Sequence, residues 1–312
     1  MRLEIMDTTL RDGEQTQGIS FSPVEKLHMA TLLLRELKVD RIEVASARVS
    51  AGEFEATFKI AEWARKNNLL DRIEVLGFVD GETSLDWIEN AGVRVINLLC
   101  KGSWRHLEKQ LRKTADEHLA DIKYVISRAA DRGMTVNLYF EDWSNGMINS
   151  ESYVYYMLDN LKDEPVARFM LPDTLGILNP DQTADFCRRL TGKYPSLHFD
   201  FHAHNDYDLA AANVLAAVKA GVKGVHTTIN GLGERAGNAP LSSVIAILND
   251  HTVHATGIDE TAINSISNVV ESYSGLRIPV NKPVIGENVF TQTSGIHADG
   301  DNKDNLYFNS LL

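Results

Sequence analysis

The sequence predicts an α/β protein of the (βα)8 barrel (TIM barrel) type, and three observations support this fold class. Short apolar runs alternate with amphipathic segments along most of the chain, which indicates strands and helices in turn. About eight such strand–helix pairs fill roughly 250 residues, the usual size of this barrel. Polar clusters follow several strands, where a barrel gathers its chemistry. A doubly wound open sheet is the alternative, but it usually needs fewer strands for this length.

The expected elements follow one another from the amino terminus. Residues 3–6 form the first strand, and Ser22, Pro23 and Glu25 have the pattern of an N-cap, an N1 proline and a capping box. Apolar residues at helical spacing continue that helix to Leu37. Further strands are expected at 41–45, 72–78, 93–99, 135–140, 167–171, 198–202 and 224–228. Helices are expected at 53–66, 85–90, 107–132, 152–161, 181–190, 209–220 and 240–248.

The pattern changes from Gly257 onward. A helix around residues 261–273 is followed by an irregular tail, 286–312, that is rich in Gly, Asn and Asp and carries His297 and Tyr307. We therefore expect a catalytic barrel over residues 1–256, then a linker helix and a small C-terminal subdomain over 257–312. The tail ends on two leucines without a stop signal, so we expect the chain to be the catalytic part of something longer.

Composition limits the partners and the compartment. The 312 residues carry a net charge of −12 with no basic block, which argues against nucleic acid or an anionic membrane as partner. No apolar run reaches transmembrane length, and the first residues lack the apolar region of a signal peptide. The 2 cysteines do not make a disulfide framework. These features predict a cytoplasmic protein that acts on small molecules.

The sequence His202-Ala203-His204 is the sharpest metal signal. Residues i and i+2 of a strand face the same side, so both imidazoles can point to one ion. Asp12 offers a carboxylate after the first strand, and Asn238 an amide oxygen after the eighth. Strands one and eight are neighbours in a closed barrel, and strand seven lies beside eight, so these groups converge only in that fold. Two unrelated polar histidines are the alternative. Such mixed ligands accommodate Zn²⁺, Mn²⁺, Co²⁺ or Mg²⁺.

Other polar residues at strand ends are candidates for binding and proton transfer. Arg11 can hold a substrate carboxylate or stabilise a developing alkoxide, with a solvated ion pair to Asp12 as the alternative. Of Glu141 and Asp142 after the fifth strand, one is a candidate for proton transfer while the other caps a turn. Thr174, after the sixth strand, can hydrogen-bond an anionic substrate.

Several weaker signals have a structural interpretation. Residues 231–236 (GLGERA) fit the loose dinucleotide-binding pattern, but no βαβ unit follows, so we expect a loop that shapes the site. Cys100 is expected to line a pocket, since no base is identifiable beside it. His226 is expected to be structural. Five other histidines before the tail are expected to be solvated: His28, His106, His118, His251 and His254. No role is assigned to His198.

Three motifs in order along the chain resemble one family. Residues 7–15 (DTTLRDGEQ), 202–206 (HAHND) and 231–238 (GLGERAGN) resemble the metal-dependent, DRE-type acyl-CoA barrels. That family includes 2-isopropylmalate synthase, homocitrate synthase, citramalate synthase and hydroxymethylglutaryl-CoA lyase. Residues 289–299 (VFTQTSGIHAD) are similar to the linker subdomain of its synthases, which favours condensation over cleavage.

Within the family, other segments resemble the citramalate synthase branch. These are residues 41–50 (RIEVASARVS), 76–81 (LGFVDG) and 137–145 (NLYFEDWSN), whereas residues 97–103 (NLLCKGS) differ from typical 2-isopropylmalate synthases. The resemblance implies condensation of acetyl-CoA with pyruvate to (R)-citramalate and CoA, in isoleucine and leucine biosynthesis. A 2-isopropylmalate synthase acting on 2-oxoisovalerate, and a lyase, are the alternatives.

The resemblance also implies roles for individual residues. It implies a divalent metal on Asp12, His202, His204 and Asn238, with the catalytic residues Arg11, Glu141, His297 and Tyr307. It implies that Arg11 and Thr174 bind the substrate, and that its side-chain pocket is lined by Leu76, Leu99 and Tyr139. It further implies a homodimer with shared active sites, in which the C-terminal subdomain covers the barrel of the partner. The amino-acid-sensing domain of the synthases is expected to be absent.

Overall fold

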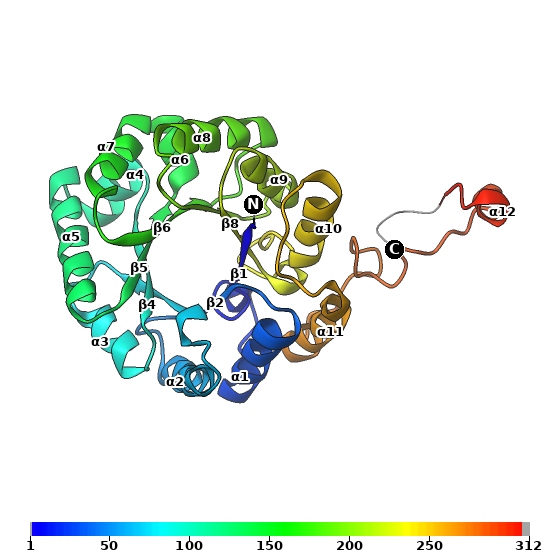
Figure 1. The fold of residues 1–312 in the computed structure, drawn as a ribbon, viewed down its shortest axis with the longest axis horizontal. Coiled ribbons are helices and arrows are strands. Elements are labelled where there is room, and N and C mark those ends of the chain that lie inside the picture. Colours follow the sequence, from blue (N-terminus) through cyan, green and yellow to red (C-terminus); the bar gives the residue numbers. More distant parts are fainter. Residues whose placement is uncertain (1, 308–312) are drawn as a thin grey trace.

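The computed structural model describes residues 2–307 and is a closed barrel of eight parallel strands in chain order, surrounded by a ring of helices (Figure 1). The barrel closes where β1 pairs with β8, with Glu4 opposite Gly224 and Asp7 opposite Thr227. The predicted fold class is confirmed. The strands are β1 (Glu4–Asp7), β2 (Arg41–Ser46), β3 (Ile73–Phe78), β4 (Val95–Lys101), β5 (Thr135–Glu141), β6 (Val166–Asp173), β7 (Phe199–Ala203) and β8 (Gly224–Thr227).

Helices follow the strands around the barrel. They are α1 (Pro23–Thr31), α2 (Ala51–Lys66), α3 (Thr83–Asn90), α4 (Trp104–His106), α5 (Ala115–Asp131), α6 (Trp143–Asn149), α7 (Glu151–Leu161), α8 (Pro180–Lys193), α9 (Ala210–Lys219), α10 (Leu241–His251), α11 (Ile263–Ser274) and α12 (Gly295–Asp304). Short 3-10 or π turns occur at Gly13–Gln15, Leu32–Glu36, Leu70–Arg72, Leu107–Leu111, Ile229–Gly231 and Glu260–Ala262. Within residues 2–307, no helix has the length and apolar character needed to span a membrane.

The start of α1 is the predicted capping box. Ser22 Oγ accepts a hydrogen bond from the Glu25 amide at 3.3 Å, and the Glu25 carboxylate accepts one from the Ser22 amide at 2.7 Å. Two of the amide groups that a helix start leaves without partners are therefore satisfied. The box fixes where the chain turns from the loop after β1 into the helix.

The single helix predicted over residues 107–132 is wrong. The chain breaks after the π turn at Leu107–Leu111, where Arg112 adopts a left-handed conformation with φ 55°. Thr114 then begins α5 with its own capping box to Glu117. The break lets a short first piece turn at the carboxyl end of β4 before α5 runs back along the barrel.

Strand side chains pack on both sides of the barrel wall, as is usual for parallel sheets. Apolar side chains such as those of Ile5, Val44 and Val75 belong to the main core. A second, smaller cluster comprises Met6, Leu76, Tyr139 and Met170, with Leu99 packed against it. Leu76, Leu99 and Tyr139 of this cluster also line the cavity described below.

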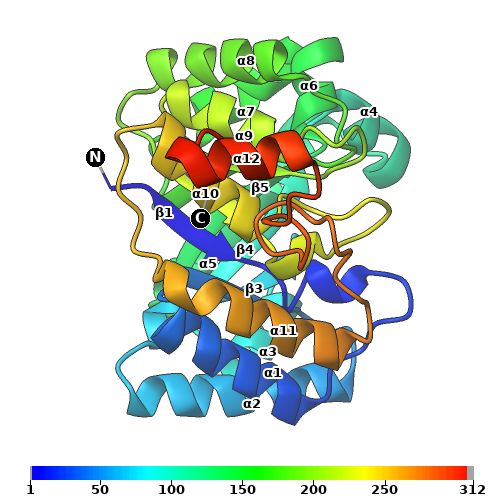
Figure 2. The ribbon, with the colours of Figure 1, turned by 90° about the vertical axis from the view of Figure 1, so that its right-hand side faces the viewer.

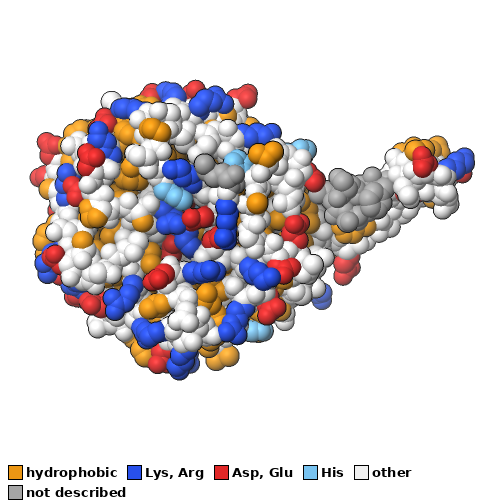
Figure 3. All heavy atoms as spheres, viewed as in Figure 1, with side chains coloured by type: hydrophobic (Ala, Val, Ile, Leu, Met, Phe, Trp, Pro, Cys, Tyr) orange, Lys and Arg blue, Asp and Glu red, His pale blue; other side chains and the backbone are white. Residues whose placement is uncertain are grey.

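Charged side chains fill another part of the interior. The Arg41 guanidinium donates to Glu74 at 2.8 Å and to Asp200 at 2.6 Å, and all three residues are buried. On the surface, Figure 3 shows further acidic and basic side chains around the middle of the barrel face in view. Burial of the charges of Arg41, Glu74 and Asp200 is tolerated because each is paired and hydrogen-bonded.

The chain after the barrel has two parts. Helix α11 lies along α1 (Figure 2), with Ile263, Ile266 and Val270 buried and a 2.6 Å hydrogen bond between Tyr273 and His28. Beyond α11 the chain leaves the barrel, and Figure 1 shows α12 clear of the ring of helices. The expectation of an irregular tail over residues 286–312 is wrong for Gly295–Asp304, which form the helix α12. The division of the chain after residue 256 stays a prediction.

Candidate active site

A cavity of about 310 Å³ opens at the carboxyl ends of the strands. Its wall contains side chains from the loops after β1 and β8 and residues at the ends of other strands. The predicted site residues in this wall are Arg11, Asp12, Leu76, Leu99, Tyr139, Glu141, Thr174, His202 and His204. The other residues in the wall were not named individually as site residues: Gln15, Ser46, Val49, Phe78, Pro172 and Glu234. Glu234 lies in the loop 231–236 that was expected to shape the site, and Gln15 lies in the motif 7–15.

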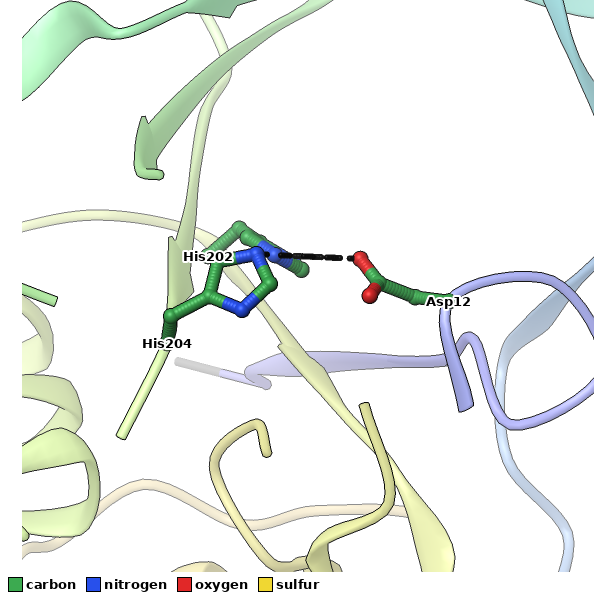
Figure 4. Close-up of side chains that lie close together, drawn as sticks. All are labelled: Asp12, His202 and His204. Carbon is green, nitrogen blue, oxygen red and sulfur yellow. Dashed lines mark ion pairs between the residues drawn. The ribbon is translucent and has the colours of Figure 1, made fainter. Parts of the chain in front are cut away.

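Asp12, His202 and His204 form a compact cluster in this wall (Figure 4). One ligand atom from each residue lies within 4.8 Å of the others. Asp12 Oδ2 is 3.4 Å from His202 Nε2 and 4.0 Å from His204 Nε2. The two histidines meet because they are two residues apart at the end of β7, and Asp12 reaches them across the closed barrel.

Asn238 lies beside this cluster, where an antiparallel bridge joins it to His204. Its Nδ2 donates to Asp12 Oδ1 at 3.1 Å and to the Leu232 carbonyl at 3.0 Å. Its Oδ1 is buried and has no hydrogen-bond partner among the described residues. A Cβ at Gly233 would lie 2.2 Å from Asn238 Nδ2, so this close approach requires glycine. A buried amide oxygen without a partner beside a carboxylate is suited to a cation.

Burial and charge set the protonation of the cluster. Burial lowers the pKa of His202 far below its ordinary value and also lowers that of His204, which favours neutral imidazoles. Burial raises the pKa of Asp12, but opposing effects, of which that of the Arg11 guanidinium is the largest, more than offset it, so the net pKa is below the ordinary value. An ionised carboxylate and neutral imidazoles are the forms that bind metals. The donor set therefore fits a divalent cation.

The side chain of Arg11 is held in place by carboxylates. Its Nε donates to Glu43 Oε2 at 2.5 Å, and its Nη1 to Asp12 Oδ2 at 3.0 Å. Burial lowers the pKa of Arg11, but Glu43 and Asp12 raise it by more, so the guanidinium stays charged. Glu43 is itself fixed by Thr8 Oγ1 at 2.7 Å and Asn97 Nδ2 at 2.8 Å. Sequence reasoning missed Glu43, although a carboxylate inside an apolar strand was a signal for it.

The two carboxylates after β5 have different surroundings. Glu141 lines the cavity and pairs with Lys101, a buried lysine that sequence reasoning also missed. Asp142 is buried and accepts a 2.6 Å hydrogen bond from Ser103 Oγ, while its backbone amide donates to Thr174 Oγ1 at 2.9 Å. Asp142 therefore secures the turns around the cavity, and Glu141 is the carboxylate exposed to it.

The Tyr139 hydroxyl forms a 2.7 Å hydrogen bond with His226 Nδ1, and His226 Nε2 lies 3.2 Å from Asp200 Oδ2. His226 is buried in the barrel, in agreement with its structural interpretation. Tyr139 therefore turns its hydroxyl toward the barrel interior, and its ring lies in the cavity wall with Leu76 and Leu99.

Two other sequence interpretations are wrong. His118 is buried, not solvated, and its Nε2 accepts a 3.1 Å hydrogen bond from the Lys101 amide. Cys100 belongs to the main core and does not line the cavity, because strand alternation turns it away from the side that Leu99 faces. Burial raises the pKa of the Cys100 thiol, which agrees with an unreactive side chain.

His297 and Tyr307 lie outside the cavity of their own chain. Their rings stack with centroids 4.2 Å apart near α12, which Figure 1 shows away from the barrel. The residues that line the cavity all come from the barrel. A catalytic role for this pair therefore needs a second copy of the chain and stays a prediction.

Comparison with known proteins identifies the family. The HMGL-like family model matches residues 2–270. The (R)-citramalate synthase CimA of Methanocaldococcus jannaschii is 34% identical over 96% of this chain and 59% of the relative. The 2-isopropylmalate synthase of Sulfolobus acidocaldarius is also 34% identical, over 96% of this chain and 75% of the relative.

A solved structure agrees in fold. HMG-CoA lyase from Brucella melitensis superposes with a TM-score of 0.74 at 19% identity, covering 88% of this chain and 99% of the lyase. A protein of Methanopyrus kandleri provisionally named (R)-citramalate synthase CimA is 37% identical over 97% of this chain. The chain spans 58% of the length of that relative. The resemblance predicted from the three motifs is confirmed: the chain belongs to the HMGL-like family.

Proposed function

We propose that this chain is the catalytic part of an acyltransferase that condenses acetyl-CoA with pyruvate to give (R)-citramalate and CoA. The observation that carries the proposal is the buried Asp12, His202 and His204 cluster, with Arg11 paired to its carboxylate inside the cavity. The names of the relatives support a 2-oxo acid as the second substrate. The 310 Å³ cavity is of a size for small molecules.

The proposed cation site consists of Asp12, His202, His204 and Asn238. A divalent cation bound there would polarise the keto group of the oxo acid and bind its carboxylate. Imidazole and oxygen ligands of this kind bind Zn²⁺, Mn²⁺, Co²⁺ and Mg²⁺, so they do not identify the metal.

Two residues are assigned to the charge of the oxo acid. Arg11, fixed between Glu43 and Asp12, offsets the negative charge that grows on the keto oxygen as the new carbon–carbon bond forms. Thr174 Oγ1 already accepts from the Asp142 amide, so its own O–H can donate to a substrate carboxylate. Both groups are held before substrate arrives, which reduces the cost of orienting them during the reaction.

The acid–base work is assigned to Glu141, together with His297 and Tyr307 of a second copy. Glu141 lines the cavity and its partner Lys101 holds its carboxylate in place, so it can face the methyl group of the thioester. Removal of a methyl proton gives the carbon nucleophile that attacks the keto carbon. Water then hydrolyses the resulting thioester and releases CoA.

Release of free thiol tests the reaction class. The purified chain, acetyl-CoA, a divalent metal and a panel of 2-oxo acids are mixed, and CoA thiol is followed with a chromogenic reagent. We expect thiol release that requires both metal and oxo acid. Thiol release without any oxo acid indicates a thioesterase, and acetyl-CoA formed from a hydroxyacyl-CoA alone indicates a lyase. A complete lack of release with every metal and oxo acid contradicts the synthase proposal.

The pocket wall predicts the choice of oxo acid. Leu76, Leu99 and Tyr139 are large side chains in one cavity wall, so they leave room for the methyl group of pyruvate and oppose the isopropyl group of 2-oxoisovalerate. We expect kcat/KM to favour pyruvate, and Leu99→Ala to raise kcat/KM for 2-oxoisovalerate by roughly 10- to 200-fold. Leu276→Ala, at an exposed leucine, is the matched control. A wild-type preference for 2-oxoisovalerate makes the chain an isopropylmalate synthase and contradicts this account of the pocket.

Shared active sites predict complementation between two inactive variants. A homodimer whose tails cross places His297 of one copy beside Arg11 of the other. We expect an Arg11→Met and His297→Ala mixture to recover up to about a quarter of wild-type activity after subunit exchange, because half of the re-paired dimers hold one intact site. Mixing Arg11→Met with the double variant is the control and recovers nothing. Zero activity after demonstrated exchange means that each site lies within one chain.

A further inference from the structure

One guanidinium joins the loops that follow β6, β7 and β8. Arg235, after β8, donates from Nε to Asp206 Oδ1 at 2.8 Å and from Nη2 to Asp206 Oδ2 at 3.0 Å. The same Nη2 donates to the Thr174 carbonyl at 2.7 Å. Paired bonds of a guanidinium to one carboxylate fix both distance and orientation. Arg235 therefore joins the Asp206 loop to the Thr174 loop.

The backbone at Arg235 indicates that its side chain is what the position requires. Arg235 has a φ of 55°, in the left-handed region where glycine is favoured over other residues. The loop uses glycine nearby, at Gly233, but has a long charged side chain at residue 235. Non-glycine residues in this region persist where surrounding contacts hold them, and they concentrate at functional sites.

The joined loops are also pressed together. A Cβ at Gly176, two residues after Thr174, would lie 2.7 Å from Asp206 Oδ2 and 2.9 Å from the His204 carbonyl. The close approach thus involves the backbone of His204 itself. Little space remains for the loops to shift as long as the Arg235 bonds are intact.

Each joined loop carries a residue of the proposed site. Asp206 lies two residues after His204, the loop of Arg235 ends at Asn238, and Thr174 lines the cavity. Arg235 itself is not among the residues that line the cavity. Its side chain is 38% exposed, and exposed ion pairs contribute little to global stability. The effect of these bonds is therefore expected in the site geometry, not in the stability of the barrel.

We propose that Arg235 is a positioning residue whose bonds to Asp206 and Thr174 hold His204, Asn238 and Thr174 in register around the cation site. The proposal rests on the proposed function, since it concerns the same site. Asp206 of the HAHND motif and Arg235 of the GLGERAGN motif have no role in the proposed reaction itself, and the positioning role assigns one to each.

The test measures cation affinity separately from catalysis. Mn²⁺ is titrated calorimetrically into metal-free wild type, Arg235→Gln, Asp206→Asn, the double variant and Arg235→Gly. The KM for pyruvate, kcat and Tm are measured for the same proteins. Arg189→Gln is the matched control, because Arg189 is 36% exposed and pairs with carboxylates on the outer helices α7 and α8.

We expect Arg235→Gln to weaken Mn²⁺ binding roughly tenfold, as for other residues that orient metal ligands, and to raise the KM for pyruvate. The double variant should be no worse than Arg235→Gln, because Asp206→Asn removes only a contact that Arg235→Gln has already lost. Arg235→Gly should show the same losses with an unchanged or higher Tm, because glycine suits the left-handed backbone. Arg189→Gln should match wild type in every measurement.

Each other outcome counts against a defined claim. Wild-type Mn²⁺ affinity and pyruvate KM in Arg235→Gln overturn the positioning role, and so do losses that only follow a lowered Tm in both Arg235 variants. If wild type binds Mn²⁺ but releases no thiol with any oxo acid, the proposed reaction fails while the Mn²⁺ affinities still decide the positioning role. If wild type binds none of Mn²⁺, Zn²⁺, Co²⁺ and Mg²⁺, both proposals are overturned.

Discussion

Replacing His202 with alanine is expected to abolish measurable turnover and to weaken divalent-cation binding by at least about a hundredfold. Residues that merely orient metal ligands cost about 10- to 100-fold when lost, so the loss of a proposed ligand should cost no less. Of the two imidazoles, that of His202 is the nearer to Asp12, with 3.4 Å between Nε2 and Oδ2. Asp12→Ala is expected to behave alike, because it also removes a partner of Arg11 and of the Asn238 amide.

Calorimetric titration with Mn²⁺ and the thiol assay check this expectation together. His251→Ala, at an exposed histidine in the last turn of α10, is the matched control and should retain both properties. Tm shows whether either variant has lost its fold. The cation site is contradicted if a folded His202→Ala variant binds Mn²⁺ like wild type. Full activity of wild type after exhaustive chelation would contradict it as well.

Replacing Arg11 with lysine is expected to lower kcat by about 10²- to 10³-fold, the usual cost of removing one donor that stabilises a developing oxyanion. Lysine keeps the charge, but its single ammonium does not reproduce a planar guanidinium that donates to Glu43 and Asp12 from different nitrogens. Mn²⁺ affinity should change much less, because Arg11 donates to the carboxylate and is not itself a ligand.

Steady-state kinetics alongside Mn²⁺ titration separate the two roles of Arg11. Arg2→Lys is the control, because Arg2 pairs with Asp40 and its side chain is 63% exposed. A kcat within tenfold of wild type in Arg11→Lys would assign Arg11 to the structure of the β1 loop. A large loss of Mn²⁺ affinity with kcat unchanged at saturating metal would assign it to the cation site alone.

The cluster of Asp12, His202 and His204 could be predicted from the sequence because two general features of the fold determine it. Strand alternation places His202 and His204 on one side, and closure of a parallel barrel brings the ends of β1, β7 and β8 together. Neither inference needs a side-chain conformation. The wall of Leu76, Leu99 and Tyr139 was implied by the family resemblance, and the position of all three at strand ends agrees with it, since strand ends of one barrel face a common cavity.

Glu43 and Lys101 could not be assigned in the same way. Each is a charged residue within a strand, and its role depends on a partner far along the chain: Arg11 for Glu43 and Glu141 for Lys101. Strand register decides whether such partners meet, and the register shifts between Glu43 and Ala45 where β2 pairs with β3. Reading the alternation of β4 would have turned Leu99 and Lys101 inward and Cys100 outward, correcting the expectation for Cys100.

Two of the helical features that the sequence did not predict were missed for different reasons. The boundary at Thr114 carried a recognisable capping-box pattern with Glu117, but the apolar periodicity on both sides hid it. Helix α12 (Gly295–Asp304) has the sequence GIHADGDNKD, which lacks an apolar stripe, so a search based on hydrophobic period has nothing to detect.

The origin of the product's carbon atoms distinguishes condensation from simple hydrolysis of the thioester. The chain is incubated with Mn²⁺, pyruvate and acetyl-CoA labelled with ¹³C in the methyl carbon, and the product is analysed by ¹³C NMR and mass spectrometry. We expect (R)-citramalate in which the labelled carbon is bonded to the former keto carbon of pyruvate, with one CoA released per product. Consumption of acetyl-CoA without this carbon–carbon bond, or with labelled acetate as the sole product, would contradict it.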